Sequence, residues 1–347
     1  MQVRTGVALS GLTTLRLGGP AGSLVEATSA AELVEAVRSA DAAGEPVLLV
    51  GGGSNLVVGD AGWPGRVVLI RSRGIAVSAD GDLRTVTVEA GEPWDALVAR
   101  TVAEGWAGLE ALSGIPGLTG ATPVQNVGAY GQEVADTITR VDVLDRETGT
   151  ELSLDAAGCR FGYRDSLFKH TDRYVVLRVV FALRAGDKSG PLRYAELVRR
   201  LGEAGDSAPV ADVREAVLEL RRGKGMVSDD ADPDTWSAGS FFTNPILAPA
   251  ELAAFEARLD PAVTYPSWPA GEGRKLSAAW LIERAGFGKG HGAGPVRIST
   301  KHTLALTHRG GGSAADLAAL AAEVRDGVEA RFGVRLHPEP RLVGLAL

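Results

Sequence analysis

An uncharged, glycine-rich run occupies residues 113–131, and the amides Gln125 and Asn126 stand within it. Glycine accepts backbone conformations with positive φ and lets its N–H group come close to a ligand, and the two prolines of the run fix bends. A neutral loop of this kind suits a diphosphate that is bound by main-chain donors. A flexible linker is the alternative, although linkers rarely carry as many apolar side chains as this run does.

A second glycine turn, residues 51–55, directly follows the apolar stretch 47–50, which we predict to be a strand. Neither glycine segment has the spacing Gly-x-Gly-x-x-Gly of the dinucleotide-binding fingerprint. The sequence therefore argues against a Rossmann-type nucleotide site.

Arg164 lies in an aromatic segment, residues 161–168, that also contains Asp165. An arginine among aromatic side chains is desolvated and needs an anionic partner. Asp165 or another internal acid could be that partner, and an anionic ligand is the functional alternative.

Ser240 lies between a glycine and two phenylalanines, with no Gly-x-Ser-x-Gly motif and no nearby histidine to activate it as a nucleophile. It fits a proton donor or a ligand hydrogen bond better than acyl transfer, and a turn or capping serine is the structural alternative. Glu339 lies between two prolines on an extended segment, so its carboxyl group is rigidly placed. It could act as an acid, a base or an orienting group, or it could simply pair with Arg341.

The first half of the chain predicts a mixture of helices and strands. A capping box of Ser29 and Glu32 predicts a helix that ends before Gly44, and Pro93 is expected as the first residue of a helix that ends at Gly105. Alternation or apolar runs predict strands at 83–89, 140–144 and 174–183.

The second half is predicted to be more helical. We expect helices at 193–201, 212–222, 249–259, 276–285 and 313–332, with strands at 303–307 and 341–346. The pair Asp212 and Glu215 is expected to open the second of these helices, and a domain boundary is expected within the polar segment 223–238. Strands and helices come in blocks rather than in regular alternation, so the fold class is α+β.

Composition excludes several classes of function. The chain has 347 residues and a net charge of −7, without the basic stripe or interleaved aromatics of a nucleic-acid-binding protein. The single Cys159, the absence of an apolar N-terminal segment and the lack of any long apolar stretch predict a soluble cytoplasmic protein that does not bind membranes. The five histidines have no zinc-like spacing, so no metal is expected, and none precedes His170, so a histidyl-linked flavin in the N-terminal half is excluded.

Taken together, these segments resemble the UDP-N-acetylenolpyruvoylglucosamine reductase family, flavoenzymes of bacterial peptidoglycan synthesis. The resemblance runs in order along nearly the whole chain, at residues 13–19, 51–56, 113–133, 162–169, 221–227, 239–245 and 338–341. It implies a two-part FAD-binding domain of the vanillyl-alcohol-oxidase (PCMH) type followed by a C-terminal α+β substrate-binding domain. The implied division is 1–66 with 333–347 and 67–228 for the two FAD-binding parts, and 229–332 for the substrate domain.

The resemblance also implies the reaction. NADPH reduces a non-covalently bound FAD, and the reduced flavin then reduces the enolpyruvyl group of UDP-N-acetylglucosamine enolpyruvate. Arg164, Ser240 and Glu339 match the family's catalytic residues, with Ser240 as proton donor and the other two at the enolpyruvyl carboxylate. A monomer without protein or nucleic-acid partners is expected.

Further matches are implied by motif. The FAD-binding set is Gly51, Gly52, Gly53, Ser54, Asn55, Leu56, Ser113, Gly114, Ile115, Pro116, Gly117, Gly120, Ala121, Gln125, Asn126, Gly128, Ala129, Tyr130 and Gly131. The substrate-binding set is Tyr163, Tyr194, Lys224, Asn244 and Arg341, of which Tyr194 could equally be a packed surface residue. Two other functions stay open: a flavin oxidase or dehydrogenase of the same fold with another substrate, and an inactive nucleotide-sugar-binding relative.

Overall fold

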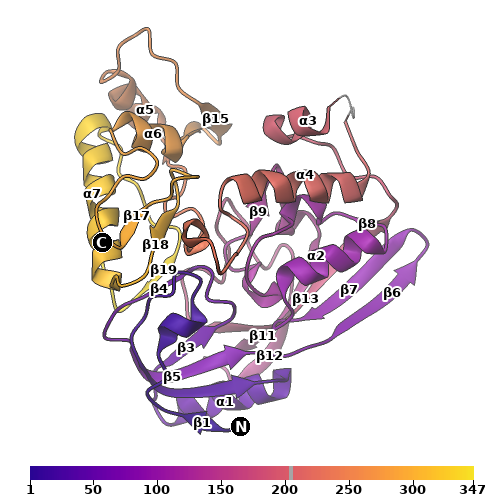
Figure 1. Cartoon of the computed structure of the whole chain (residues 1–347). Helices are drawn as coiled ribbons and strands as arrows, with labels where there is room; N and C mark the ends of the chain where they lie inside the picture. Colours follow the sequence, from indigo (N-terminus) through magenta and orange to yellow (C-terminus); the bar gives the residue numbers. More distant parts are fainter. Residues whose placement is uncertain (203–205) are drawn as a thin grey trace. The chain divides into compact units, whose positions relative to one another are not determined.

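A computed structural model describes residues 1–202 and 206–347, which form two compact units (Figure 1). Unit 1 consists of Met1–Val7, Ala21–Gly52 and Pro64–Val227, and unit 2 of Ala8–Pro20, Gly53–Trp63 and Ser228–Leu347. Each unit is thus assembled from three separate stretches of chain.

Unit 1 carries most of the strands. Its helices are α1 (Ala30–Ala42), α2 (Trp94–Ala103), α3 (Ala195–Leu201) and α4 (Val210–Gly223). Its strands are β1 (Val3–Arg4), β2 (Ala21–Ala27), β3 (Val47–Val50), β5 (Trp63–Ile70), β6 (Ile75–Asp80), β7 (Leu83–Glu89), β8 (Trp106–Ala107), β9 (Gly128–Ala129), β10 (Gln132–Glu133), β11 (Ile138–Asp145), β12 (Thr150–Asp155) and β13 (Tyr174–Ala185).

Two main sheets organise unit 1. One has the order β1-β2-β5-β3 and includes the parallel pair β3 and β5. The other has the order β12-β11-β13-β7-β6, with β8 also paired to β13, and all of its pairs are antiparallel.

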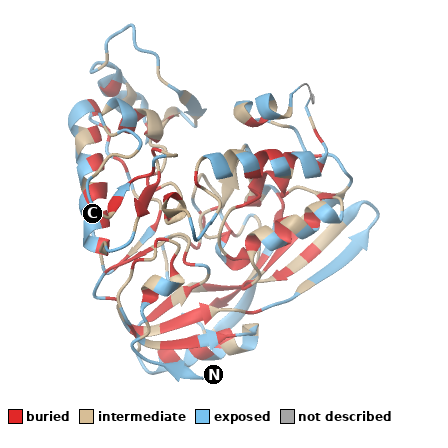
Figure 2. Cartoon of the chain, viewed as in Figure 1, coloured by how far each residue is buried: buried red, intermediate tan, exposed pale blue. Residues whose placement is uncertain are grey.

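The strand β13 lies at the centre of the larger sheet because its sequence is apolar almost throughout, as suits a strand covered on both faces. Val179 and Phe181 join the cluster under α2, whereas Val175 and Leu177 join the cluster that contains α1 and β3. Figure 2 shows this buried centre, and the outer ends of β6 and β7 are exposed.

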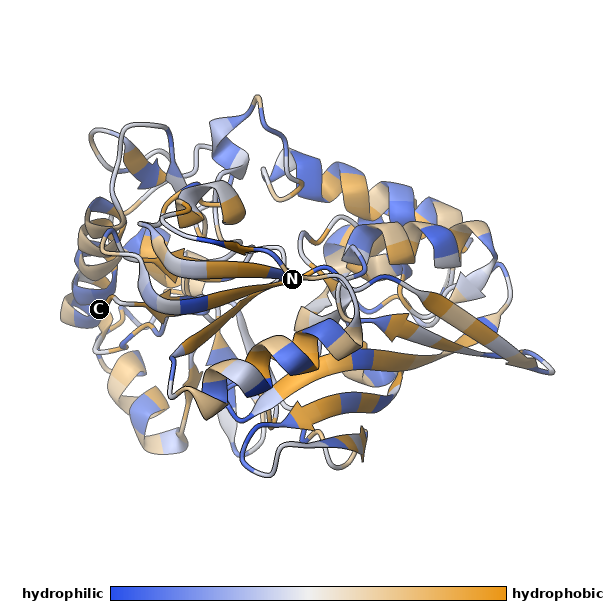
Figure 3. Cartoon of the chain, turned by 90° about the horizontal axis from the view of Figure 1, so that it is seen from below, coloured by the Kyte–Doolittle hydropathy of each residue, from blue (hydrophilic) through white to orange (hydrophobic). Residues whose placement is uncertain are grey.

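Local sequence signals explain where the predicted helices agree with those of the structure and where they differ. The Ser29 hydroxyl accepts the Glu32 amide and caps α1, and Pro93 precedes α2 as its N-cap rather than being its first residue. The helix α4 begins at Val210 after the N-cap Pro209, so the expectation that Asp212 and Glu215 open it is wrong. Figure 3 shows the alternation of hydrophilic and hydrophobic residues along the helices.

Unit 2 contains α5 (Pro249–Glu256), α6 (Ala278–Arg284) and α7 (Ala314–Phe332) together with short strands. The strands are β4 (Leu56–Val58), β14 (Ile246–Leu247), β15 (Ser267–Ala270), β16 (Gly273–Leu276), β17 (Val296–Ile298), β18 (Leu306–His308) and β19 (Arg341–Val343). They pair as a three-stranded sheet β14-β16-β15, an antiparallel pair β17-β18 and a parallel pair β19-β4.

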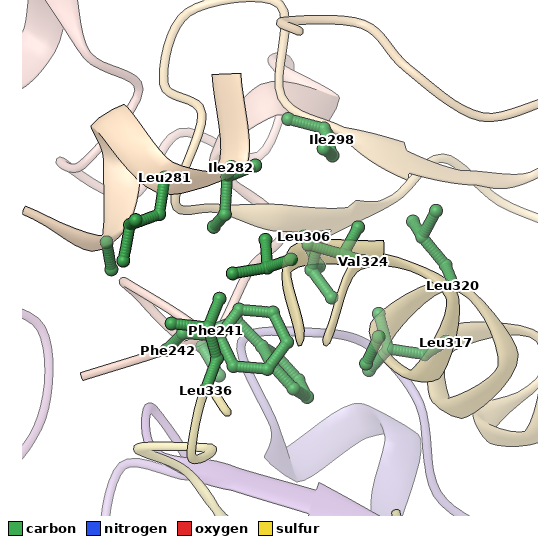
Figure 4. Close-up of a cluster of buried hydrophobic side chains, with 14 of the residues drawn as sticks. Phe241, Phe242, Leu281, Ile282, Ile298, Leu306, Leu317, Leu320, Val324 and Leu336 are labelled. Carbon is green, nitrogen blue, oxygen red and sulfur yellow. The ribbon is translucent and has the colours of Figure 1, made fainter. Parts of the chain in front are cut away.

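A single large hydrophobic cluster fills unit 2 (Figure 4). Phe241 and Phe242 are each 1% exposed and pack there with side chains of α6, α7 and Leu336. The helix α7 begins with a capping box of Ser313 and Asp316, and both carboxylate oxygens of Asp60 accept amides of its first turn. The cluster therefore fixes the backbone on both sides of Ser240.

Candidate active site

In unit 1 the Arg164 guanidinium donates hydrogen bonds to two backbone carbonyls. Its Nη1 donates to the Asn126 carbonyl at 3.2 Å and its Nη2 to the Gly128 carbonyl, while Glu133 lies 3.7 Å away. Its side chain is 19% exposed and its guanidinium carbon lies 5.4 Å from the centre of the Tyr163 ring. Arg164 is therefore fixed in place by two carbonyl oxygens of the glycine-rich run and by the nearby Glu133 carboxylate.

Asp165 is not the ion-pair partner of Arg164. One Asp165 carboxylate oxygen contacts the His170 ring at 2.9 Å and accepts the Ser166 amide. One acid that does lie near Arg164 is Glu133 on β10, 31 residues earlier in the chain.

Asn126 connects this arginine to the glycine-rich run. Its side-chain amide donates to Glu133 at 2.8 Å and to the Gly162 carbonyl at 3.0 Å, and its side-chain oxygen accepts the Ala135 amide. Asn126, Tyr130 and Arg164 all have a positive φ, between 45° and 51°. Left-handed conformations are uncommon for residues other than glycine and often accompany functional sites.

Glycines of the glycine-rich run lie so close to neighbouring backbone that a larger residue would not fit. A Cβ atom on Gly52 would lie 2.8 Å from the Gly117 Cα, so the two glycine turns in unit 1 touch backbone to backbone. The amides of Gly114, Gly120 and Ala121 donate to protein acceptors, namely Asp95 and the carbonyls of Ala90 and Leu118. These three amides therefore shape the run rather than point to a ligand.

Gly51 and the remaining predicted members of the run also lie in unit 1. Gly51 accepts a hydrogen bond from Arg71 through its carbonyl at 3.0 Å. Ser113 is buried, Ile115, Pro116, Gln125 and Ala129 are partly buried, and Gly131 is exposed.

Arg221 is a candidate site residue that the sequence did not single out. Its Nη2 donates to the Met226 carbonyl at 2.7 Å, whereas its buried Nε has no hydrogen-bond partner within the described residues. Burial lowers the pKa of Arg221, and a Cβ atom on Gly114 would lie 3.4 Å from that Nε. An unsatisfied buried cation beside the first glycine turn fits a group that offers carbonyl or phosphate oxygens, as FAD does. The twin arginines 221–222 ahead of a glycine were the available signal.

In unit 2, Ser240 and Glu339 lie on two segments that run side by side. The Glu339 amide donates to the Phe241 carbonyl at 2.8 Å and the Thr243 amide donates to the His337 carbonyl at 3.1 Å. Phe242 and Pro338 form an antiparallel bridge between the same segments. The structure thus brings two of the three predicted catalytic residues together.

The turn before β4 joins this arrangement. The Asn55 carbonyl accepts the Arg341 amide at 2.9 Å, and the Asn55 side-chain amide donates to the Glu339 carbonyl at 3.5 Å. Gly53, Ser54 and Leu56 belong to the same stretch of unit 2. A predicted FAD-binding turn therefore supports the backbone of a predicted catalytic residue.

The substrate-binding candidates divide between the units. Tyr163, Tyr194 and Lys224 lie in unit 1, where Lys224 pairs with Glu196 at 2.5 Å. Asn244 and Arg341 lie in unit 2, where the Asn244 side-chain oxygen accepts the Ala278 amide at the start of α6. Burial raises the pKa of Tyr130, next to this group in unit 1, to about 12, so its hydroxyl keeps its proton at neutral pH.

Within residues 1–202 and 206–347, no group of three or more His, Cys, Asp or Glu side chains is arranged to hold a metal ion. In the same part of the chain, no helix combines the length and the apolar character needed to cross a membrane.

Two family models of known proteins match this chain, one in each half. Residues 21–155 match the model of an FAD binding domain, and residues 232–343 match the model of the UDP-N-acetylenolpyruvoylglucosamine reductase C-terminal domain.

Curated relatives match over nearly their full length. The reductase of this name from Salinispora arenicola is 61% identical, over 98% of this chain and 95% of the relative. The one from Saccharopolyspora erythraea is 60% identical, over 99% and 96%. The crystal structure of UDP-N-acetylenolpyruvylglucosamine reductase from Thermus caldophilus matches with a TM-score of 0.68 at 25% identity, covering 99% of this chain and 100% of that one.

The expected α+β fold, with an FAD-binding domain of the vanillyl-alcohol-oxidase type, is confirmed, as is FAD as the cofactor. The chain belongs to the UDP-N-acetylenolpyruvoylglucosamine reductase family, a family of flavin-dependent oxidoreductases.

Proposed function

We propose that this protein uses NADPH to reduce the enolpyruvyl group of UDP-N-acetylglucosamine enolpyruvate, giving UDP-N-acetylmuramate for peptidoglycan synthesis. Family membership supports the reaction class. The observation that carries the proposal is the pairing of residues 241–243 with residues 337–339, which brings a hydroxyl-bearing and a carboxyl-bearing residue onto neighbouring rigid segments.

Bound FAD would supply hydride chemistry, accepting a hydride from NADPH and passing it to the vinyl CH2 carbon of the substrate. As that C–H bond forms, the electrons of the C=C bond move onto the adjacent carbon and its carboxylate. We assign the Ser240 hydroxyl as the donor of the proton that this adjacent carbon receives. Within the described residues the Ser240 hydroxyl makes no hydrogen bond, which leaves it available for that task.

Arg164 and Glu339 are assigned to the carboxylate of the enolpyruvyl group. A guanidinium held by carbonyl oxygens keeps its full charge, which stabilises the negative charge that builds on the carboxylate. Glu339, fixed between two prolines, can share a proton with that carboxylate or orient a water molecule.

The other assignments follow the same proposal. The flavin would be held without a covalent bond by the glycine segments 51–56 and 113–131, with Arg221 as an additional contact. Lys224 and Asn244 would bind the diphosphate of the substrate or the phosphate of NADPH, and Tyr163, Tyr194 and Arg341 would line the substrate. The three-part division at 66/67, 228/229 and 332/333, the monomeric state and a cytoplasmic location are parts of this proposal.

The Ser240→Ala variant tests the central step. We expect flavin reduction by NADPH to stay within about twofold, while reoxidation by the enolpyruvyl sugar falls by about 10²–10⁴-fold, as the loss of a general acid predicts. Stopped-flow absorbance of the flavin would measure both half-reactions separately. Thr243→Val removes another hydroxyl from the same segment and is expected to change neither rate by more than about threefold.

Equal losses in both half-reactions would contradict the role of Ser240. Reoxidation by oxygen that outpaces reoxidation by the enolpyruvyl sugar would instead indicate a flavin oxidase of the same fold. A protein that binds UDP-sugar but whose flavin NADPH does not reduce would indicate an inactive relative.

A further inference from the structure

In unit 1 the Lys224 ammonium pairs with the carboxylate of Glu196. Lys224 follows the last turn of α4, and Glu196 lies in the first turn of α3. Their side chains form an ion pair of 2.5 Å and are 30% and 33% exposed. The pair therefore lies at the surface, where water and soluble ions reach it.

Two tyrosines flank this ion pair. The rings of Tyr130 and Tyr194 meet edge to face with centres 5.2 Å apart, and the Lys224 ammonium lies 5.9 Å from the centre of the Tyr130 ring. Tyr194 is 41% exposed although it is aromatic. Tyr194 contacts Tyr130, the ring nearest to the cation, so a nucleotide would find an exposed stacking surface close to a phosphate contact.

Glu196 occupies the place at this cation that a phosphate group would take. An ion pair of this exposure contributes only about 0–1 kcal/mol, so a diphosphate with two anionic groups can displace the carboxylate. A phosphate that approaches Lys224 meets the Glu196 carboxylate at the same ammonium, and the two negative groups repel each other. Glu196 thus lowers the affinity of the site for a nucleotide diphosphate.

We propose that Glu196 is a placeholder for a nucleotide diphosphate on Lys224 and that it sets the affinity of the enzyme for its nucleotide ligands. The inference rests on the proposed function, in which Lys224 binds a diphosphate or an NADPH phosphate. It adds that the first turn of α3 contains the acid that competes with that ligand.

The test measures dissociation constants of UDP and NADP⁺ for the FAD-loaded enzyme by calorimetry at low salt. Glu196→Gln removes the competing charge and keeps the size of the side chain, so at least one of the two ligands should bind about threefold to fivefold more tightly. In a Lys224→Met background, the same Glu196→Gln substitution should leave both constants unchanged, because the competition no longer exists.

A matched control is available in the same two helices. Arg200 of α3 and Glu219 of α4 form another exposed ion pair, so Glu219→Gln also loosens α3 from α4 without touching Lys224. This variant should leave both dissociation constants unchanged.

The outcomes separate the two proposals. If Lys224→Met weakens the binding of a ligand but Glu196→Gln does not tighten it, or Glu219→Gln tightens it equally, the placeholder role is wrong while the phosphate contact stands. If Lys224→Met leaves both ligands unaffected, the assignment of Lys224 in the proposed function is wrong, and the placeholder role is overturned with it.

Discussion

In unit 1, Arg164 is positioned by polar contacts to carbonyls of the glycine-rich run, and three residues of this region have left-handed backbone conformations. In unit 2, Ser240 and Glu339 lie on paired extended segments, and the phenylalanines next to Ser240 are buried in the hydrophobic cluster. Polar positioning depends on the geometry of a few hydrogen bonds, whereas apolar positioning depends on volume. Substitutions in the two units should therefore fail in different ways.

The largest expected effect is on the stability of unit 2. Phe241→Ala removes a fully buried ring from the cluster and should lower the free energy of unfolding by about 3–5 kcal/mol. Urea denaturation followed by tryptophan fluorescence would measure it, with the exposed Ile246→Ala of the same unit as the control, expected within about 0.5 kcal/mol of the wild type. A loss below about 1 kcal/mol for Phe241→Ala would mean that packing does not fix this segment.

The next effect is on the activity of unit 1. Arg164→Lys keeps the charge but loses the planar fork that bonds two carbonyls, so kcat/KM for the enolpyruvyl sugar should fall about hundredfold while the unfolding free energy changes little. Arg160→Lys is the matched control, because Arg160 has the same φ of 51° and its side chain is exposed. Similar losses of kcat/KM for both variants would contradict a specific role of the Arg164 guanidinium.

The smallest effect concerns Asp95, which joins the glycine-rich run to α4. Burial alone would raise the pKa of Asp95. Hydrogen bonds from Arg214 and from the Gly114 amide lower this pKa by more than burial raises it, so the net pKa is below its usual value. A lowered pKa means that the carboxylate stabilises unit 1 fully above the pKa of the unfolded state, about 3.9, and that this contribution is lost as the pH falls through the folded pKa.

The Asp95 side chain is 39% exposed, so solvent screens its contacts. Asp95→Asn should therefore cost only about 0.5 kcal/mol of unfolding free energy at pH 7, and the difference from the wild type should shrink as the pH falls below about 4. Denaturation curves at several pH values would measure this difference. A difference that stays constant down to pH 3 would mean that the charge of Asp95 contributes nothing.

Local signals in the sequence predicted much of unit 1. The capping box before α1, the alternation of β7 and the apolar run of β13 lie within single short segments, so each could be found without knowledge of the fold. The sheet β14-β16-β15 was missed because its strands have only two to four residues, too few for an alternating pattern to be recognised.

The candidate site was predictable only in part. Motifs located Arg164, Ser240 and Glu339. Asp165 or another internal acid was expected beside Arg164, and motifs did not indicate Glu133, which the fold brings near. The roles of Arg221 and Glu196 depend on burial and on one contact between helices, neither of which a linear pattern records.

The division of unit 2 into three stretches bears on how the protein is made on the ribosome. The strand β4 is synthesised early, but its parallel partner β19 is the last strand of the chain, so β4 must wait for almost the entire polypeptide to emerge. The segments of unit 1 up to Val227 are all complete before most of unit 2 exists. A fragment that begins at Ser228 would lack both N-terminal stretches of its own unit, so it should not fold when expressed alone.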